Sequence, residues 1–582
     1  MSARHALIAF SLAGLAFAGC SANSSSTNGH PTASGSNTGN PGGGASPILV
    51  GNGGSTGLIT DPSNNGSGGA GDHNNPATCA EAAANRTYIG CDFWPTITYN
   101  PVYKEFSFAV VVANGGSSPA QVKVQRLGMD VATVMVPPAG LTTIPLPWVP
   151  ELKGEEFDHT DLNKGARRKA SVLSQGGAYH LLSSTPVTAW QFNPLDYQQP
   201  AANCPGLPAG ASNCLSVSND ASLLLPSTAM TGHYRLFGRS ARLEGGQEPL
   251  TSAQGGFAIT ATVDNTVVQI QLTGQRKAEV GTGAKIGAAT LAAGTGVAAA
   301  MPGDTVSYTL KAGDVLQLMG TWGAYEPEPH GDLSGSVLVA DKPVQVIALN
   351  PLLTCVPTAV DGNPDHIEET VLPAEVIGDS YIVAPPTGPD LRVPGHMVRF
   401  FGNVDGTNLT YPSGGAPADA PSKLDAGQVV EIGPVMDAFE VKADQPFAVA
   451  SIMLGGTKQD PTGTRGDPSL TMEVTPRQFR TQYTFLAPTS YLENYADILL
   501  PAGASATLDG NPLTGTATPV GTSGWSVVRE KLAAGSNSGA HRLEASAKVG
   551  LQVLGFGLAT SYCYPGGLDL ELISVPPEIV VK

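Results

Sequence analysis

The segment GSVLVADKPVQVIALNPL (Gly335–Leu352) decides the fold class, because two short alternating runs flank a polar turn that ends in a proline. Alternation of polar and apolar residues is typical of a strand with one buried face. Proline fixes φ and has no N–H, so it fits a turn or the start of a strand and not the middle of a sheet. The segment therefore predicts two strands joined as a hairpin.

The same pattern recurs along the chain. Two clear copies are YHLLSSTPVTAWQFNPL (Tyr179–Leu195) and FEVKADQPFAVASIMLGG (Phe439–Gly456), and HRLEASAKVGLQVLGFG (His541–Gly557) is a fainter one. Other alternating runs, such as FSFAVVVAN (Phe106–Asn114), lie between the copies. Repeated short strands separated by turn signals indicate a series of β-sandwiches.

A second recurring element follows each clear copy and gives the length of the repeat. Its copies occupy 219–236, 366–383 and 466–485. Pro343 and Pro446 are 103 residues apart, and Tyr381 and Tyr483 are 102 apart. Two independent landmarks thus agree on a repeat of about 100 residues.

Composition supports an all-β chain and excludes some functions. Gly (71) and Pro (47) are abundant among the 582 residues, and both disfavour helices. The net charge of −17 argues against binding to nucleic acid, which needs clustered Lys and Arg. We expect an all-β fold of tandem, closely packed β-sandwich units, each of about 100–150 residues, after a disordered N-terminal tether.

The expected organisation follows from these patterns. It consists of a signal peptide (1–19), a lipidated cysteine with a disordered linker rich in Gly, Ser and Asn (20–78), and β-sandwich units at 79–200, 201–355 (with an insertion), 356–460 and 461–582. The linker has too little apolar surface to offset the entropy of ordering it.

The first twenty residues are typical of an export signal. A basic start precedes an apolar run over 6–18, which is too short to span a membrane comfortably. The run ends in FAGC (Phe17–Cys20), which resembles the lipobox of bacterial lipoproteins, although Phe17 stands where Leu is commonest. The resemblance implies that Cys20 carries the lipid and that the protein is an outer membrane lipoprotein or lies at the cell surface. An ordinary signal peptide is the alternative.

Six further cysteines form an even set, which suits disulfides in an exported protein. Proximity favours Cys79 with Cys91 and Cys204 with Cys214, leaving Cys355 with Cys563. Sequence alone does not choose among the possible pairings. No CxxC pair is present, so a metal site built on cysteine is disfavoured.

Several strings resemble one known family. They are CDFWPTITYN (Cys91–Asn100), FAVVVAN (Phe108–Asn114), LPWVPELKG (Leu146–Gly154), GAYHLLSSTPVTAWQFNPL (Gly177–Leu195) and SNDASLLLPSTAMTGHYRL (Ser218–Leu236). Together they resemble the IgGFc-binding-protein N-terminal domain family, over most of residues 79–567. The resemblance implies an extracellular, non-catalytic binding or adhesion module. It transfers no ligand-contacting residue and does not imply that antibody is bound. The lipobox-like start suggests a bacterial member.

Two short motifs have both a functional and a structural interpretation. Arg465-Gly466-Asp467 spells the RGD tripeptide of integrin recognition, but a turn of the repeat explains it better. Asp361, Asn363 and Asp365 alternate as in the start of an EF-hand and are a weak Ca²⁺ candidate. His366 replaces the required Gly, so we favour a solvated acidic turn.

Other candidates are a charged stretch and four tryptophans. Residues 158–169 are rich in charge, and we expect an exposed loop there. Trp190 alternates within a predicted strand, which favours core packing. Trp94 and Trp148 each adjoin a proline and have the better claim to exposure in a ligand surface, which Trp322 could also line.

The leading hypothesis is a cell-surface binding or adhesion lipoprotein that is not an enzyme and has no cofactor. Its expected partner is a macromolecule, protein or glycan, at the cell surface, and its only membrane contact is the lipid. No HExxH or P-loop pattern occurs. The alternatives are an exported hydrolase of polysaccharide or peptide, whose carboxylates meet only in the fold, and a purely architectural envelope protein.

Overall fold

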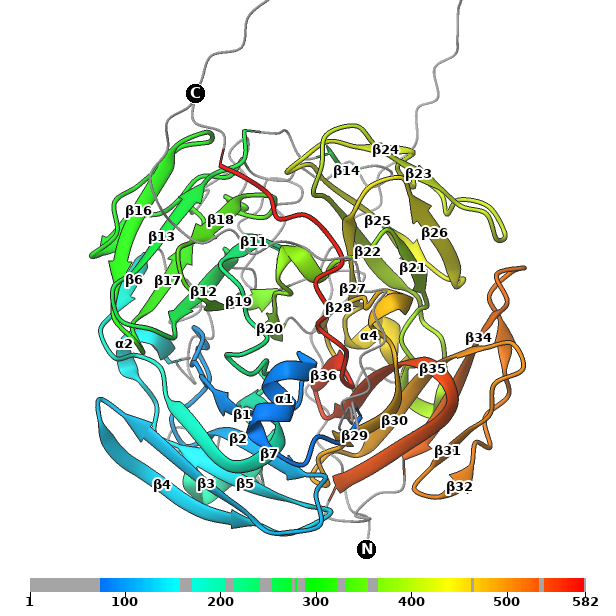
Figure 1. Ribbon diagram of the computed structural model, residues 1–582, viewed down its shortest axis with the longest axis horizontal. Helices are drawn as coiled ribbons and strands as arrows, with labels where there is room; N and C mark the ends of the chain where they lie inside the picture. Colours follow the sequence, from blue (N-terminus) through cyan, green and yellow to red (C-terminus); the bar gives the residue numbers. More distant parts are fainter. Residues whose placement is uncertain are drawn as a thin grey trace, which may run out of the picture. The chain divides into compact units, whose positions relative to one another are not determined.

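Strands dominate the computed structural model, so the all-β prediction is confirmed (Figure 1). The structure describes residues 74–156, 170–204, 213–240, 254–274, 278–279, 288–321, 331–353, 365–461, 465–532 and 539–579. Its helices are short: α1 (Cys79–Asn85), α2 (Pro150–Lys153) and α4 (Gly456–Gln459), with 3₁₀ turns η1 (Ala201–Asn203), η2 (Ala374–Val376), η3 (Pro389–Leu391) and η4 (Pro476–Gln478). The signal peptide, Cys20 and the linker up to residue 73 lie outside the described residues.

The strands form sheets in which one pairing scheme recurs. In the first copy, β1 (Gly90–Phe93) and β3 (Ala120–Arg126) pair with the first half of β7 (His180–Asn193), and β4 (Met129–Val136) pairs with β3. On the second half of β7, β2 (Phe108–Asn114) and β10 (Asp220–Leu223) pair with it, and β5 (Gly140–Leu146) pairs with β2. The second has the sheets β11 (His233–Arg235), β18 (Val337–Ala340), β13 (Thr266–Gln271), β16 (Thr305–Leu310) and β15 (Gly294–Thr295), β6 (Ser171–Ser174), β17 (Val315–Met319), β12 (Gly256–Ala261), β19 (Val344–Leu353), β20 (Asp365–Thr370).

The third and fourth copies follow the same scheme. The third has β21 (Ser380–Val383), β26 (Phe439–Ala443), β23 (Thr407–Thr410), β24 (Lys423–Leu424) and β14 (Ala278–Glu279), β25 (Val429–Val435), β22 (His396–Gly402), β27 (Phe447–Met453), β28 (Leu470–Met472). The fourth has β29 (Arg480–Leu486), β31 (Ala506–Leu508), β32 (Asn511–Pro512), β30 (Glu493–Pro501), β33 (Thr518–Pro519), β34 (Trp525–Leu532) and β36 (Thr560–Pro565) around β35 (Ala540–Gly557). A separate pair is β8 (Gln198–Pro200) with β9 (Asn213–Leu215).

The predicted hairpins are wrong, because the two strands on either side of the proline do not pair with each other. β18 pairs with β11 and β13, whereas β19, directly after it, pairs with β12 and β20 in another sheet. β26 and β27 are divided between two sheets in the same way, and β7 and β35 run through the switch without a break. The proline therefore marks the point where the chain leaves one sheet for the next, since it offers no N–H to either ladder.

A side chain two residues before each of these switch points fixes its geometry. Ser184, Asp341, Asp444 and Ser546 accept hydrogen bonds from the backbone N–H groups of Gln121 (2.9 Å), Val267 (2.8 Å), Asn408 (2.8 Å) and Ser505 (2.9 Å), respectively. The donors lie in or directly before the neighbouring strands β3, β13, β23 and β31. A short polar side chain thus satisfies a backbone donor where the main-chain ladder is interrupted.

The last strands of the four copies meet one another. β10 contacts β20 and β36, and β28 contacts the same two strands, which closes a cycle of contacts. Figure 1 shows β20, β28 and β36 near the middle of the view. We predicted that units end at residues 200, 355 and 460. The strands β10, β20 and β28 come after these positions, yet each pairs with a strand of the preceding unit.

A buried ion network joins the second and third sets of sheets. The Arg239 guanidinium forms two hydrogen bonds of 2.8 Å with the Glu431 carboxylate, and Arg399 lies 3.2 Å from Asp332 and also pairs with Glu431. All four side chains are at most 3% exposed. Removing one partner from such a network leaves an uncompensated buried charge.

Candidate functional site

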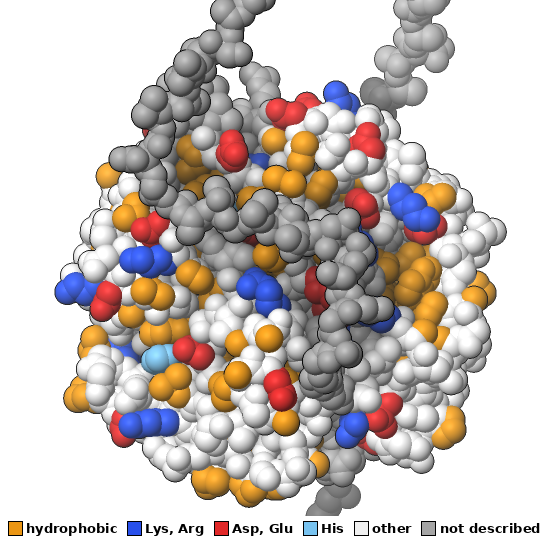
Figure 2. All heavy atoms as spheres, in the orientation of Figure 1, with side chains coloured by type: hydrophobic (Ala, Val, Ile, Leu, Met, Phe, Trp, Pro, Cys, Tyr) orange, Lys and Arg blue, Asp and Glu red, His pale blue; other side chains and the backbone are white. Residues whose placement is uncertain are grey.

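An open groove lies between the third and fourth sets of sheets, and we call it the β25–β34 groove. Its volume is about 840 Å³. It is lined by three segments: the loop 413–419 between β23 and β24, residues 433–439 from the end of β25 to the start of β26, and residues 518–521 at β33 and the turn before β34. Pro385, Val393, Val527 and Arg529 complete the lining. Figure 2 shows apolar side chains in a hollow at the right of the view, where Figure 1 places β21 and β34.

The groove exposes apolar side chains beside polar ones, and its backbone is constrained. Met436 is 53% exposed and Val393 is 39% exposed, which is high for side chains of this type. Pro385, Pro417, Pro434 and Pro519 restrict the walls. Gly414 and Gly415 adopt φ values of +91° and +89°, which side chains with a Cβ rarely reach. The loop before β24 therefore depends on its glycine pair.

Charge in the groove is unevenly distributed. The Arg529 guanidinium donates to the Thr387 hydroxyl (2.8 Å), to Asp497 (2.9 Å) and to the Pro385 carbonyl (2.9 Å). Asp419 and Asp437 are exposed on the walls, and neither forms an ion pair with another residue in the described part of the chain. The groove therefore presents exposed apolar side chains together with two carboxylates that form no ion pair within the described ranges.

A second cluster lies where the last strands meet, and we call Asp220, Asp365, Asp467, Glu368 and Glu369 the acidic centre. All five side chains are at most 1% exposed. Asp220 accepts hydrogen bonds from the Ser469 hydroxyl (2.9 Å) and from the Glu368 backbone N–H (3.1 Å), and so joins three copies of the repeat. Ser561, on β36, donates to Asp467 (2.9 Å) and adds the fourth.

Burial controls the ionisation of the acidic centre. It raises the pKa of the Asp220 carboxyl well above its usual range. It also raises the pKa of Asp365, and the nearby Asp467 carboxyl raises that pKa further. The pKa of Glu369 is raised by burial and then by Asp220. Burial thus favours the neutral form of these three carboxyls, as expected of polar groups inside a packed core.

The structure corrects the interpretation of the acidic stretch around Asp365. We expected a solvated acidic turn, but Asp365, Glu368 and Glu369 are buried, because β20 carries them into the meeting point of the last strands. Asp361 and Asn363, the other residues of the weak Ca²⁺ candidate, lie outside the described residues. In the described ranges, no group of three or more His, Cys, Asp or Glu side chains is arranged to hold a metal ion.

The RGD tripeptide belongs to the framework and is not displayed. Arg465 forms ion pairs with Asp390 (2.6 Å), Asp460 (2.9 Å) and Glu493, and Asp467 lies in the acidic centre. Gly466 has a φ of +81°. The turn that we favoured therefore accounts for the motif.

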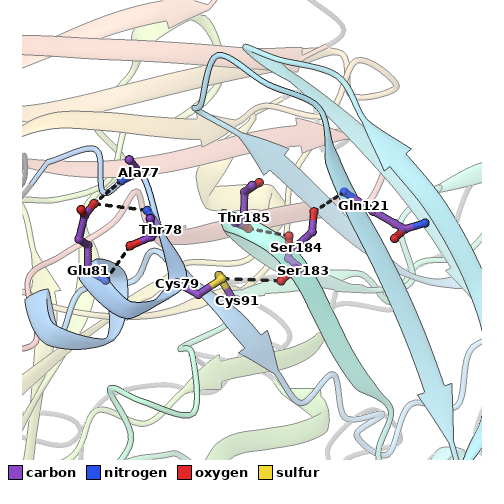
Figure 3. The surroundings of a disulfide bond; sticks show 9 residues. All are labelled: Ala77, Thr78, Cys79, Glu81, Cys91, Gln121, Ser183, Ser184 and Thr185. Atoms are coloured by element: carbon purple, nitrogen blue, oxygen red, sulfur yellow. Dashed lines mark hydrogen bonds between the residues drawn. A yellow bond between two sulfur atoms is a disulfide. The ribbon is translucent and has the colours of Figure 1, made fainter.

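The cysteines form two disulfides in the structure, Cys79–Cys91 and Cys204–Cys214. Figure 3 shows the first beside β7, where the Ser183 carbonyl lies near Cys79, together with the hydrogen bond from Gln121 to Ser184. Cys563 is a free, buried thiol, so the expected bond to Cys355 is not formed in this structure. Cys563 packs with Met453, Tyr495, Leu554 and Phe556, and Cys355 lies outside the described residues.

The tryptophans are mostly internal. Trp190 is fully buried, as expected. The exposure expected of Trp94 is wrong: it is 6% exposed and stacks on His180 at 4.1 Å between ring centroids. Trp148 is half-buried, and its N–H donates to the Phe106 carbonyl (2.8 Å). Trp322 and the charged stretch 158–169 lie outside the described residues.

The groove was missed in the sequence. Its walls come from three segments that are separate in the sequence, and each segment shows only the Gly and Pro signals of a turn. The pair Gly414-Gly415 and the proline-flanked run 417–421 were the available signals, but they indicate loops and not that the loops converge.

A family model matches more than half of the chain. The model of the family described as IgGFc binding protein matches residues 220–555, more than half of the chain and most of the described strands. No curated protein matches the sequence. In the described residues, no helix has the length and apolar character needed to cross a membrane. The chain belongs to the IgGFc binding protein family.

Proposed function

We propose that the chain is a non-catalytic binding protein, exported and displayed at the cell surface, whose ligand is another protein. Membership of a binding family supports this function. The two disulfides support an oxidising, extracellular location. The observation that carries the proposal furthest is the β25–β34 groove, because it is open and exposes apolar side chains such as Met436, whereas the acidic centre is buried.

The proposed display depends on the N-terminal region. We propose that Cys20 carries a lipid, that residues 20–78 form a flexible spacer, and that four sandwich units follow. The recurring pairing scheme supports the division into four. It also favours unit boundaries after β10, β20 and β28, since each of these strands pairs with a strand that precedes it in the chain.

A capture experiment tests the proposed function. The full chain with Cys20→Ala is immobilised and exposed to surface-protein extracts from host cells and from the source cells. We expect saturable capture of a surface protein that soluble chain competes away. Absence of saturable capture from either extract would contradict a binding role.

The native chain and the Cys20→Ala variant are fractionated in parallel. We expect membrane attachment only for the native chain, and attachment of both would rule out the lipid anchor.

A further inference from the structure

The β25–β34 groove has the features of a site for a protein segment more than those of a small-molecule pocket. Pockets for small molecules usually combine an apolar lining with several convergent polar groups. In this groove the Arg529 guanidinium already donates hydrogen bonds within the protein, to Asp497, Thr387 and Pro385, so it is not directed at a ligand. Exposed glycine backbone and rigid proline walls instead suit an extended chain, and rigid walls lower the entropy lost on binding.

The charges select the chemistry of that segment. Asp419 and Asp437 are the exposed carboxylates of the groove, and they flank apolar surface that includes Met436. A cationic side chain close to aliphatic or proline residues complements both features. The net charge of −17 acts in the same direction, because it attracts basic partners and repels acidic ones over a longer range.

Resting on the proposed function, we propose that the β25–β34 groove binds an extended protein segment in which a Lys or Arg lies next to proline or aliphatic residues. The apolar residues of the segment cover Met436 and Val393, and its cation lies within reach of Asp419 or Asp437. Exposed charge pairs are individually weak, so the apolar contact supplies most of the affinity and the carboxylates supply the selectivity.

Selection from a random peptide library tests this inference without a known ligand. A phage-displayed library of dodecapeptides is panned on the immobilised full chain. Affinities of the enriched peptides are then measured for the unmodified chain and for the double variant Asp419→Lys/Asp437→Lys. The matched control is Glu571→Lys/Glu578→Lys, which makes the same change in net charge at two exposed positions away from the groove.

We expect enriched peptides to carry Lys or Arg beside proline or aliphatic residues. Their affinity should fall about tenfold or more in the groove variant and less than threefold in the control. No enrichment, enrichment of acidic or uncharged peptides, or an equal loss in both variants would overturn the inference. If the capture experiment succeeds while this one fails, the binding function stands and the ligand lies elsewhere on the surface.

Discussion

Replacing Glu473 with Gln should make the protein more resistant to alkaline conditions. Glu473 follows β28 and is 4% exposed. It accepts hydrogen bonds from the Ser451 hydroxyl and from the Gln552 amide (3.1 Å). Burial raises its pKa from 4.5 to about 7, so the folded protein holds a proton there that the unfolded chain releases at lower pH.

The sign and size of the effect follow from this difference in proton binding. Between pH 4.5 and about 7 the folded state binds the extra proton, so its stability falls as the pH rises. At about 1.4 kcal/mol per pH unit, this group accounts for a loss of about 3 kcal/mol by pH 8. A glutamine side chain still donates and accepts hydrogen bonds but does not ionise, so it removes the loss.

Urea unfolding at pH 4.5, 6 and 8, followed by tryptophan fluorescence, measures the effect. The free energy of unfolding of Glu473→Gln, relative to the native protein, should rise by about 3 kcal/mol from pH 4.5 to pH 8. The control Glu571→Gln, at an exposed position, should show no such trend. A difference between Glu473→Gln and the native protein that stays the same at all three pH values would show that the folded state holds no extra proton on Glu473.

Three other changes test the framework. Arg239→Met should lower the free energy of unfolding by about 3–5 kcal/mol, because it leaves the buried Glu431 partly uncompensated. The matched control Arg542→Met, at the exposed pair with Glu544, should cost less than about 1 kcal/mol, and equal midpoints in urea would be inconsistent with a buried network. Cys204→Ser/Cys214→Ser opens a loop with a sequence separation of 10 and should cost about 3 kcal/mol, measured against the native protein under the same oxidising conditions; no change in midpoint would count against the bond. Asp341→Ala should lower the free energy of unfolding by about 1 kcal/mol, because the Val267 N–H loses its acceptor, and Asp341→Asn should restore most of that stability. Full stability of the alanine variant would show that the side chain does not fix the switch between sheets.

The sequence was enough to predict the class of fold and its repetition. Abundant Gly and Pro, alternating strands and proline landmarks about 100 residues apart are local features, and the structure confirms an all-β fold. Which strands pair with each other depends on contacts between residues that are far apart in the sequence. The run before Pro343 and the run after it look like a hairpin locally, yet Val337–Ala340 and Val344–Leu353 pair in different sheets.

The candidate site was harder to predict for the same reason. Asp365 and its acidic neighbours have the composition of an exposed loop, and only the meeting of four distant strands buries them. The groove residues carry no chemical motif. Met436 and Asp437, between β25 and β26, become significant only when the loop before β24 and the segment before β34 come close to them. Sequence patterns report local structure, whereas both clusters depend on tertiary contacts.

The most direct test of the account is an isotherm for the surface protein captured by the immobilised full chain. It is measured for the native groove, for Met436→Glu in the groove and for Met135→Glu on β4, where a methionine is similarly exposed. We expect affinity to fall at least tenfold for Met436→Glu and to be unchanged for Met135→Glu. Equal affinity for all three chains would contradict binding through the β25–β34 groove.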